Sequence, residues 1–123
     1  MKALKGIVVT TSNVFYERRF DDPLYKTVGE VVGGDIEIVY PRGLEEPLCM
    51  IVNDEGRLIG LPINPCGCGL YGTWRHGSPI VGDLVIMKHG YRNGEPDIVG
   101  LSDEEATAIM LQLESYGLKK EGE

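Results

Sequence analysis

Five consecutive apolar residues at positions 48–52 constrain the fold of this chain more than any other stretch. They are Leu48, Cys49, Met50, Ile51 and Val52. Successive side chains of a strand point to opposite faces of a sheet, so apolar residues would face both sides here. A sheet with one face in water would carry polar residues on that face. The sequence therefore predicts a sheet that is covered on both faces.

A polar segment follows this run, ends in Gly56, and leads into a second short apolar run at positions 58–61. Two such runs predict a β-hairpin, in which Gly56 supplies the positive φ of the turn. We expect Leu58 and Leu61 to fill the core. Pro62 has no N–H to donate, so the strand should end there and release Asn64 into a loop.

Two helices are predicted from local signals. The first begins with Asp22 as N-cap and Pro23 in the first helical position, and it ends at residues 33–34, which are both glycine. The second begins at a capping box formed by Ser102 and Glu105 and ends near Gly117. Its apolar residues at helical spacing form one stripe: Ala106, Ile109, Met110 and Leu113.

Further strands are predicted from β-branched and apolar runs at residues 4–15, 35–41, 80–87 and 98–101, the first of them interrupted at 10–13. Residues 65–79 form a glycine-rich connection that we expect to be a loop, as are residues 42–47 and 89–97, the latter with a turn at Asn93 and Gly94. Residues 16–20 are expected to be an exposed loop; alternatively, their rings and arginines form a stacking surface for a planar or anionic ligand.

These elements predict an α+β fold with a mainly antiparallel sheet of about five or six short strands and two helices. The expected domain spans residues 1–117, followed by a frayed, charged tail at 118–123. Two helices leave three ways to cover both faces of the sheet. Both helices pack on it, the sheet curls into a partial barrel, or a second subunit covers one face. A homo-oligomer is expected, with a dimer favoured by symmetry.

Composition excludes several functional classes. Hydrophobic residues make up 42% and charged residues 25% of the chain, which is ordinary for a soluble globular protein. No apolar run reaches the length of a membrane span, and we expect no membrane partner. Three cysteines, an odd number, favour reduced thiols and a cytosolic location. The net charge is −7 and no basic patch is visible, so nucleic acid is not an expected partner.

Catalytic and metal-binding signals are weak. Cys66, Cys68, His76 and His89 could in principle bind zinc, but the cysteine spacing differs from that of a standard zinc site. A Cys–His nucleophile pair would lack an orienting group. Asp35 and Asp83 each follow a glycine, which favours a role in turns over acid–base chemistry. We therefore expect no enzyme activity, no bound metal and no cofactor.

The best candidate site combines aromatic and arginine side chains from loops that leave the ends of strands. An aromatic ring and an arginine from each of two loops could hold a base and a phosphate. The simpler alternative is that these residues only hold the loops in place. The candidate ligand-binding residues are Tyr40, Arg42, Asn64, Trp74, Arg75 and His76.

Three stretches, residues 32–41, 53–64 and 80–86, resemble a small family from phages and mobile elements known as domain of unknown function 3846. The resemblance spans about residues 2–115. The family supplies no catalytic residues to transfer. What it implies is a genetic context of accessory genes near antirestriction genes, and hence a role in counter-defence.

We accordingly expect a non-catalytic binding module, a phage or mobile-element accessory protein that sequesters a nucleotide-like immune signal of the host. The first alternative is an acidic inhibitor that binds a basic host protein, such as a defence or nucleic-acid enzyme, through Glu104, Glu105 and Glu114. The second is a small metal-dependent hydrolase.

Overall fold

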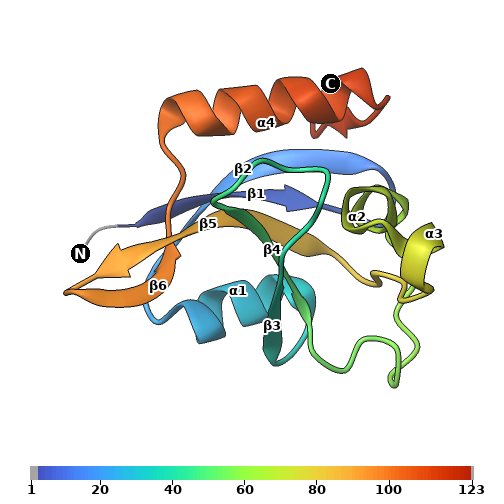
Figure 1. Ribbon diagram of the computed structural model, residues 1–123, viewed down its shortest axis with the longest axis horizontal. Helices are drawn as coiled ribbons and strands as arrows, with labels where there is room; N and C mark the ends of the chain where they lie inside the picture. Colours follow the sequence, from blue (N-terminus) through green and yellow to red (C-terminus); the bar gives the residue numbers. More distant parts are fainter. Residues whose placement is uncertain (1–2, 123) are drawn as a thin grey trace.

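A computed structural model describes residues 3–122, with the side chains of Trp74 and His76 left undescribed. Helices and one mainly antiparallel sheet form an α+β fold, as predicted (Figure 1). The elements in chain order are β1 (Leu4–Val9), β2 (Val14–Phe20), α1 (Leu24–Val32), β3 (Ile36–Val39), β4 (Leu48–Asn53), α2 (Pro65–Tyr71), α3 (Thr73–His76), β5 (Leu84–Arg92), β6 (Glu95–Val99), α4 (Asp103–Ser115) and β7 (Lys119–Lys120).

The sheet is open and has the strand order β3-β4-β5-β1-β2-β7, while β6 pairs with β5 outside this path. Strand β5 is its centre, because its first half pairs with both β4 and β1 and its second half pairs with β6. All pairs are antiparallel except that of β2 with β7. The sheet does not close into a barrel.

Helices cover both faces of the sheet (Figure 1). On one face, Val28 and Val32 of α1 pack with Cys49 and Ile51 of β4. On the other face, residues of α2 and α4 pack with Met50 and its neighbours. The prediction from the apolar run is confirmed: Cys49, Met50, Ile51 and Val52 are all buried. Since helices of the same chain supply the cover, two-sided burial no longer argues for a second subunit.

The predicted hairpin after β4 is wrong. Residues 54–60 form turns, and the two residues expected to fill the core do not: Leu58 is 86% exposed and Leu61 is only half-buried. Both edges of β4 are already paired, with β3 and β5, which leaves no edge for another strand. The left-handed conformation falls on Gly60, with φ +76°, and not on Gly56. Gly56 instead allows close packing, because a Cβ there would lie 2.6 Å from Cγ2 of Val81.

Other loop predictions are also wrong. Residues 16–20 belong to β2 and pair with β1. Most of residues 65–79 form α2 and α3, and most of residues 89–97 form the β5–β6 hairpin. The turn of that hairpin is at Asn93 and Gly94, as predicted, with φ values of 54° and 80°. In each case strand pairing or helix packing orders a stretch whose own composition resembles a loop.

The two predicted helices are confirmed, with one correction at the first. Pro23 is the N-cap of α1, and the Asp22 carboxylate binds Arg92 instead of capping the helix. Ser102 and Glu105 form both hydrogen bonds of the capping box of α4. The expected frayed tail is in part ordered, since Leu118 is buried and Lys119–Lys120 form β7.

Within residues 3–122, no helix combines the length and apolar character that a membrane crossing requires.

Candidate functional site

The segment between β3 and β4, residues 40–47, lies against the C-terminal end of α2. The Gly43 N–H donates to the Leu70 carbonyl over 2.9 Å. Glycine favours this approach, because a Cβ on Gly43 would lie 2.9 Å from Cδ2 and 3.1 Å from Cα of Leu70. The Cδ of Arg42 lies 4.0 Å from the position that a Cβ on Gly72 would take. The structure thus brings together the two segments from which the sequence predicts a ligand clamp.

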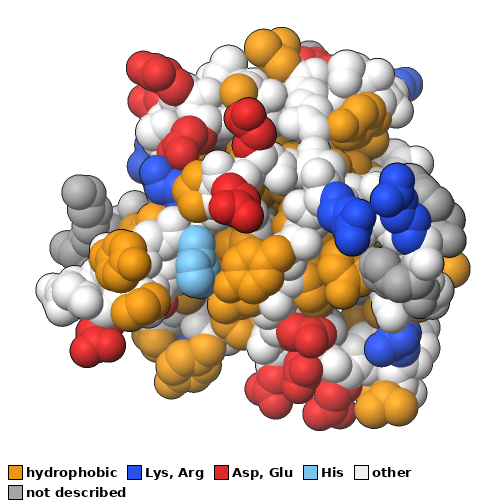
Figure 2. Space-filling view, viewed as in Figure 1, with side chains coloured by type: hydrophobic (Ala, Val, Ile, Leu, Met, Phe, Trp, Pro, Cys, Tyr) orange, Lys and Arg blue, Asp and Glu red, His pale blue; other side chains and the backbone are white. Residues whose placement is uncertain are grey.

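A cleft of about 580 Å³ lies beside this segment; its lining includes Tyr40, Arg42, Leu44, Glu46, Leu48 and His89. We call it the Tyr40–His89 cleft. Its volume falls within the usual range of small-molecule sites. Figure 2 shows this face of the molecule. Apolar side chains lie on both sides of a histidine, and Lys and Arg side chains gather toward the end that carries α2 and α3.

A tyrosine–histidine pair forms one wall of the Tyr40–His89 cleft. The Tyr40 hydroxyl and Nε2 of His89 are 3.0 Å apart, at hydrogen-bonding distance. The two rings meet edge to face, with centroids 5.5 Å apart and an interplanar angle of 87°. The backbone N–H of His89 donates to the Pro47 carbonyl over 2.8 Å, which fixes the strand that carries the imidazole. The pair is therefore held in place, while Tyr40 stays 58% exposed to a ligand.

Charge in the Tyr40–His89 cleft comes from Arg42 and Glu46. Arg42 is exposed, and among the described residues it makes no ion pair. A free guanidinium can donate two parallel hydrogen bonds to a phosphate or carboxylate. The cleft therefore combines a cation, two rings and hydrogen-bonding groups.

Asn64 is not in this cleft. Its side chain is fully buried, at 0% exposure, and its carboxamide serves the fold. The Oδ1 accepts from the Gly67 N–H at 2.9 Å and so caps α2. The Nδ2 donates to the carbonyls of Val9 and Gly82, at 3.1 and 3.0 Å. The expectation that Asn64 binds a ligand from a loop is corrected, because a buried amide with these partners has no group left to offer.

The remaining predicted site residues belong to α3. Arg75 is exposed on this short helix, three residues after Gly72, and the Arg42 side chain lies near Gly72. The side chains of Trp74 and His76 lie outside the described residues. His89, by contrast, lines the cleft although the sequence suggested it only as a metal ligand. Position alone puts His89 on the same face of β5 as Met87 and Tyr91. The pairing of β4 with β5 then brings His89 near Tyr40, which the sequence does not show.

The cysteines of α2 have separate surroundings. The Cys68 thiol donates to the Ile80 carbonyl and its sulfur accepts from the Ile80 N–H, over 3.5 and 3.3 Å. Burial raises the pKa of the Cys66 thiol to about 11, so this thiol is neutral at pH 7.

No three His, Cys, Asp or Glu side chains described in the structure lie close enough to hold a metal ion. Asp83 accepts a hydrogen bond from the Thr11 N–H, which is a turn contact.

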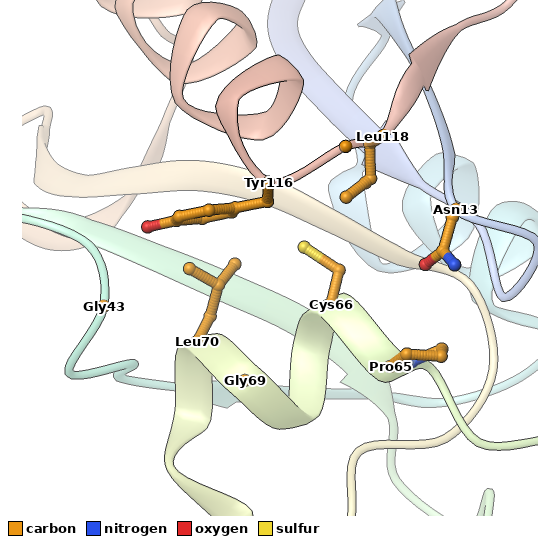
Figure 3. A pocket seen from close by; sticks show the side chains of 9 residues that line it. Asn13, Gly43, Pro65, Cys66, Gly69, Leu70, Tyr116 and Leu118 are labelled. Atoms are coloured by element: carbon orange, nitrogen blue, oxygen red, sulfur yellow. The ribbon is translucent and has the colours of Figure 1, made fainter.

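A second cleft, of about 480 Å³, lies between α2 and the C-terminal end of α4 (Figure 3). We call it the α2–α4 cleft. The floor comes from α2 and the roof from residues 116–118, while Asn13 and Gly43 close the two ends. Sequence analysis missed this cleft, because no local pattern shows that residues so far apart in the chain enclose a space.

The fold and the clefts define a small α+β protein in which one open sheet lies between helices and carries open clefts of ligand size. The chain belongs to the family described as Domain of unknown function (DUF3846), whose family model matches residues 2–114. Neither the curated proteins nor the solved structures contain a significant match to it.

Proposed function

We propose that this protein is a non-catalytic binding module and that its ligand is a small, planar anion such as a nucleotide. The observation that carries the proposal is the meeting of Arg42 with the Tyr40–His89 pair in one cleft. Arg42 supplies the positive charge that a phosphate needs, and the paired rings supply an apolar and hydrogen-bonding wall for a base.

The neighbouring segment extends this arrangement. Arg42 lies against Gly72, the residue before α3, and Arg75 of α3 is an exposed second cation. A ligand with more than one phosphate would reach from Arg42 to Arg75. The carboxylate of Glu46 at the rim would repel a phosphate placed beside it. This favours a ligand whose base faces Glu46 and whose phosphates face α3.

The wider part of the proposal is biological. A module that binds without reacting would act by sequestration, so its effect depends on its affinity and amount. As an accessory protein of a phage or mobile element, it would withhold a nucleotide-like immune signal in the cytoplasm of the host. The expected homodimer would double the sites per particle without changing the site itself.

Thermal unfolding across a panel of cyclic nucleotides, linear dinucleotides and ADP-ribose tests the proposal. A ligand present at 100 times its dissociation constant stabilises the fold by about 2.7 kcal/mol. We expect at least one member to raise the unfolding temperature of the wild type and to lose this effect in Arg42→Gln. Arg57→Gln is the matched control, because Arg57 is exposed and lines a different cleft. Stabilisation by no panel member, or equal stabilisation of both variants, would contradict the proposal.

A second candidate function uses the outer face of α4. Acidic side chains gather over the N-terminal half of this helix (Figure 2), and Leu111 beside them is 62% exposed. This face would suit a basic protein partner. Glu105 does not contribute, since it accepts from Lys88 over 2.8 Å and from the Ser102 N–H. Salt-sensitive binding to a basic partner that Glu104→Gln with Glu114→Gln abolishes would support this candidate; binding unchanged by that double variant would exclude it.

No cluster of metal-binding side chains among the described residues favours the metal-dependent hydrolase. Metal analysis of untagged protein tests that alternative directly.

A further inference from the structure

We propose that the α2–α4 cleft is a second binding site, separate from the Tyr40–His89 cleft, and that it takes a small, neutral aromatic molecule of one or two rings. The proposal rests on three observations: how the cleft is kept open, what its walls are made of, and how rigidly they are held. None of these depends on Arg42 or on a nucleotide.

The cleft is open because α2 presents a glycine to it. A Cβ on Gly69 would meet no atom within 4 Å, whereas the other helical glycine of α2, Gly67, is packed tightly against the core. In Figure 3 the Cys66 sulfur and the Leu70 side chain rise from α2 toward Tyr116 and Leu118. The space above Gly69 is thus bounded by a thiol, an aliphatic chain and an aromatic ring.

The walls of the cleft carry no charge. None of the described residues that line it is Asp, Glu, Lys, Arg or His. The Cys66 thiol is neutral, since burial raises its pKa, and Leu118 is also buried. A charged ligand would lose hydration here without a partner, so the cleft selects against ions. The exposed carboxamide of Asn13 at one end offers a hydrogen bond to a polar edge of the ligand.

Hydrogen bonds hold the roof of the cleft in place. The N–H of Leu118 donates to the Leu113 carbonyl and that of Gly117 to the Glu114 carbonyl, which is the pattern of a Schellman motif. Gly117 has φ +93°, the left-handed conformation that this motif needs. The Lys119 N–H then donates to the Asn13 carbonyl over 3.1 Å. The roof is therefore tied to α4 on one side and to the β1–β2 turn on the other.

Gln112 connects the roof of the cleft to the end that Gly43 closes. The Nε2 of Gln112 donates to the Gly43 carbonyl over 2.8 Å and to the Tyr116 hydroxyl over 2.7 Å. This contact fixes the Tyr116 ring, which is 55% exposed and lies above Leu70 in Figure 3. A ligand ring that contacts Tyr116 and Leu70 would bind a surface that is already ordered, and preorganisation of this kind lowers the entropy cost of binding.

Ligand-observed NMR with four probes of similar size tests the proposal. Indole and benzamide are the neutral probes, and benzoate and benzylammonium are the charged ones. We expect saturation transfer to the neutral probes only. Amide shifts in a titration with indole should centre on Cys66, Gly69, Leu70 and Leu118.

Variants separate this cleft from the rest of the surface. Gly69→Phe fills the space without a backbone clash and should abolish indole binding, while Gly69→Ala should keep it. Ala108→Phe adds the same ring to an exposed position of α4 outside the cleft and should also keep it. If Gly69→Phe does not fold, Tyr116→Ala is the second variant; it removes an exposed ring and should weaken indole binding roughly three- to tenfold.

Several results would overturn the proposal: no binding of either neutral probe, equal binding of the charged probes, or indole binding that survives in Gly69→Phe. Sedimentation provides a further check. A dimer of the wild type that Gly69→Phe dissociates would show that the cleft is a contact between copies instead of a ligand site. Arg42→Gln should leave indole binding unchanged, so this proposal and the nucleotide proposal can fail separately.

Discussion

At the scale of single residues, two glycines in α2 have opposite roles. A Cβ on Gly67 would lie 2.7 Å from side-chain atoms of both Ile80 and Leu84, so this glycine lets the helix approach the sheet. A Cβ on Gly69 would meet open space in the α2–α4 cleft. Identical residues two positions apart therefore serve packing in one case and an open surface in the other.

Replacing each glycine with alanine should change stability in opposite directions. Gly67→Ala overpacks the core and should lower the free energy of unfolding by about 1–3 kcal/mol. Gly69→Ala improves helix propensity without a clash and should raise it by about 0.5–1 kcal/mol. Urea unfolding monitored by circular dichroism measures both values. A destabilised Gly69→Ala would contradict the open space above α2.

Asn64 stabilises the fold through its side-chain hydrogen bonds, which leave no group to bind a ligand. Asn64→Ala leaves the Gly67 N–H and the Val9 and Gly82 carbonyls without this partner in a buried environment. Each buried group left unsatisfied costs about 1–3 kcal/mol, so we expect a loss of roughly 3 kcal/mol or more in the free energy of unfolding. The same urea experiment tests this value. A loss below about 0.5 kcal/mol would contradict a structural role and return Asn64 to the candidate ligand-binding residues.

At the scale of elements, what the sequence could predict depends on where the signal lies. Helix α4 is set by local chemistry, the capping box of Ser102 and Glu105 and one apolar stripe, and it forms where these signals place it. Helix α1 is similar, although Arg92 takes the expected cap Asp22. The hairpin after β4 failed because strand pairing is a long-range choice. Both edges of β4 were occupied by β3 and β5, which no local pattern shows.

The attachment of α4 to β5 should depend on pH. The hydrogen bond from Lys88, followed by that from the Ser102 N–H, holds the pKa of Glu105 below its ordinary value of 4.5. A lowered pKa in the folded state stabilises the fold above the unfolded value, and this contribution disappears as pH falls through the folded value. Glu105→Gln should therefore be less stable than the wild type at pH 7, by at most about 1 kcal/mol for a partly exposed pair.

Urea unfolding at about pH 7 and about pH 3 measures this difference. We expect the gap between Glu105→Gln and the wild type to shrink at the lower pH, where the carboxylate of the wild type takes up a proton. Asp22 and Asp103 also have lowered pKa values, but they change equally in both proteins. Glu104→Gln, on the exposed side of α4, is the control. A gap that stays constant between the two pH values would show that the charge of Glu105 does not stabilise the fold.

At the scale of the whole molecule, the central prediction from sequence holds: a sheet that is buried on both faces. The five apolar residues of 48–52 carry that information, because successive side chains of a strand point to opposite faces and here both sets are apolar. The same reasoning predicted only part of the candidate site. Residue types predicted Tyr40 and Arg42 as lining residues. His89 lines the cleft because of the strand register, and Asn64 does not line it because its side chain is buried. Clefts are made by segments distant in the chain, so their full lining follows from topology.

We propose that the Tyr40–His89 cleft holds a nucleotide-like anion through Arg42. Native mass spectrometry of the protein purified from the cells in which it occurs tests it most directly, because it reports subunit number and any retained small molecule together. We expect a retained molecule of nucleotide mass on the wild type, on Arg57→Gln and on Gly69→Phe, and its loss from Arg42→Gln. A wild type without a retained molecule, or one retained equally by Arg42→Gln, would contradict it.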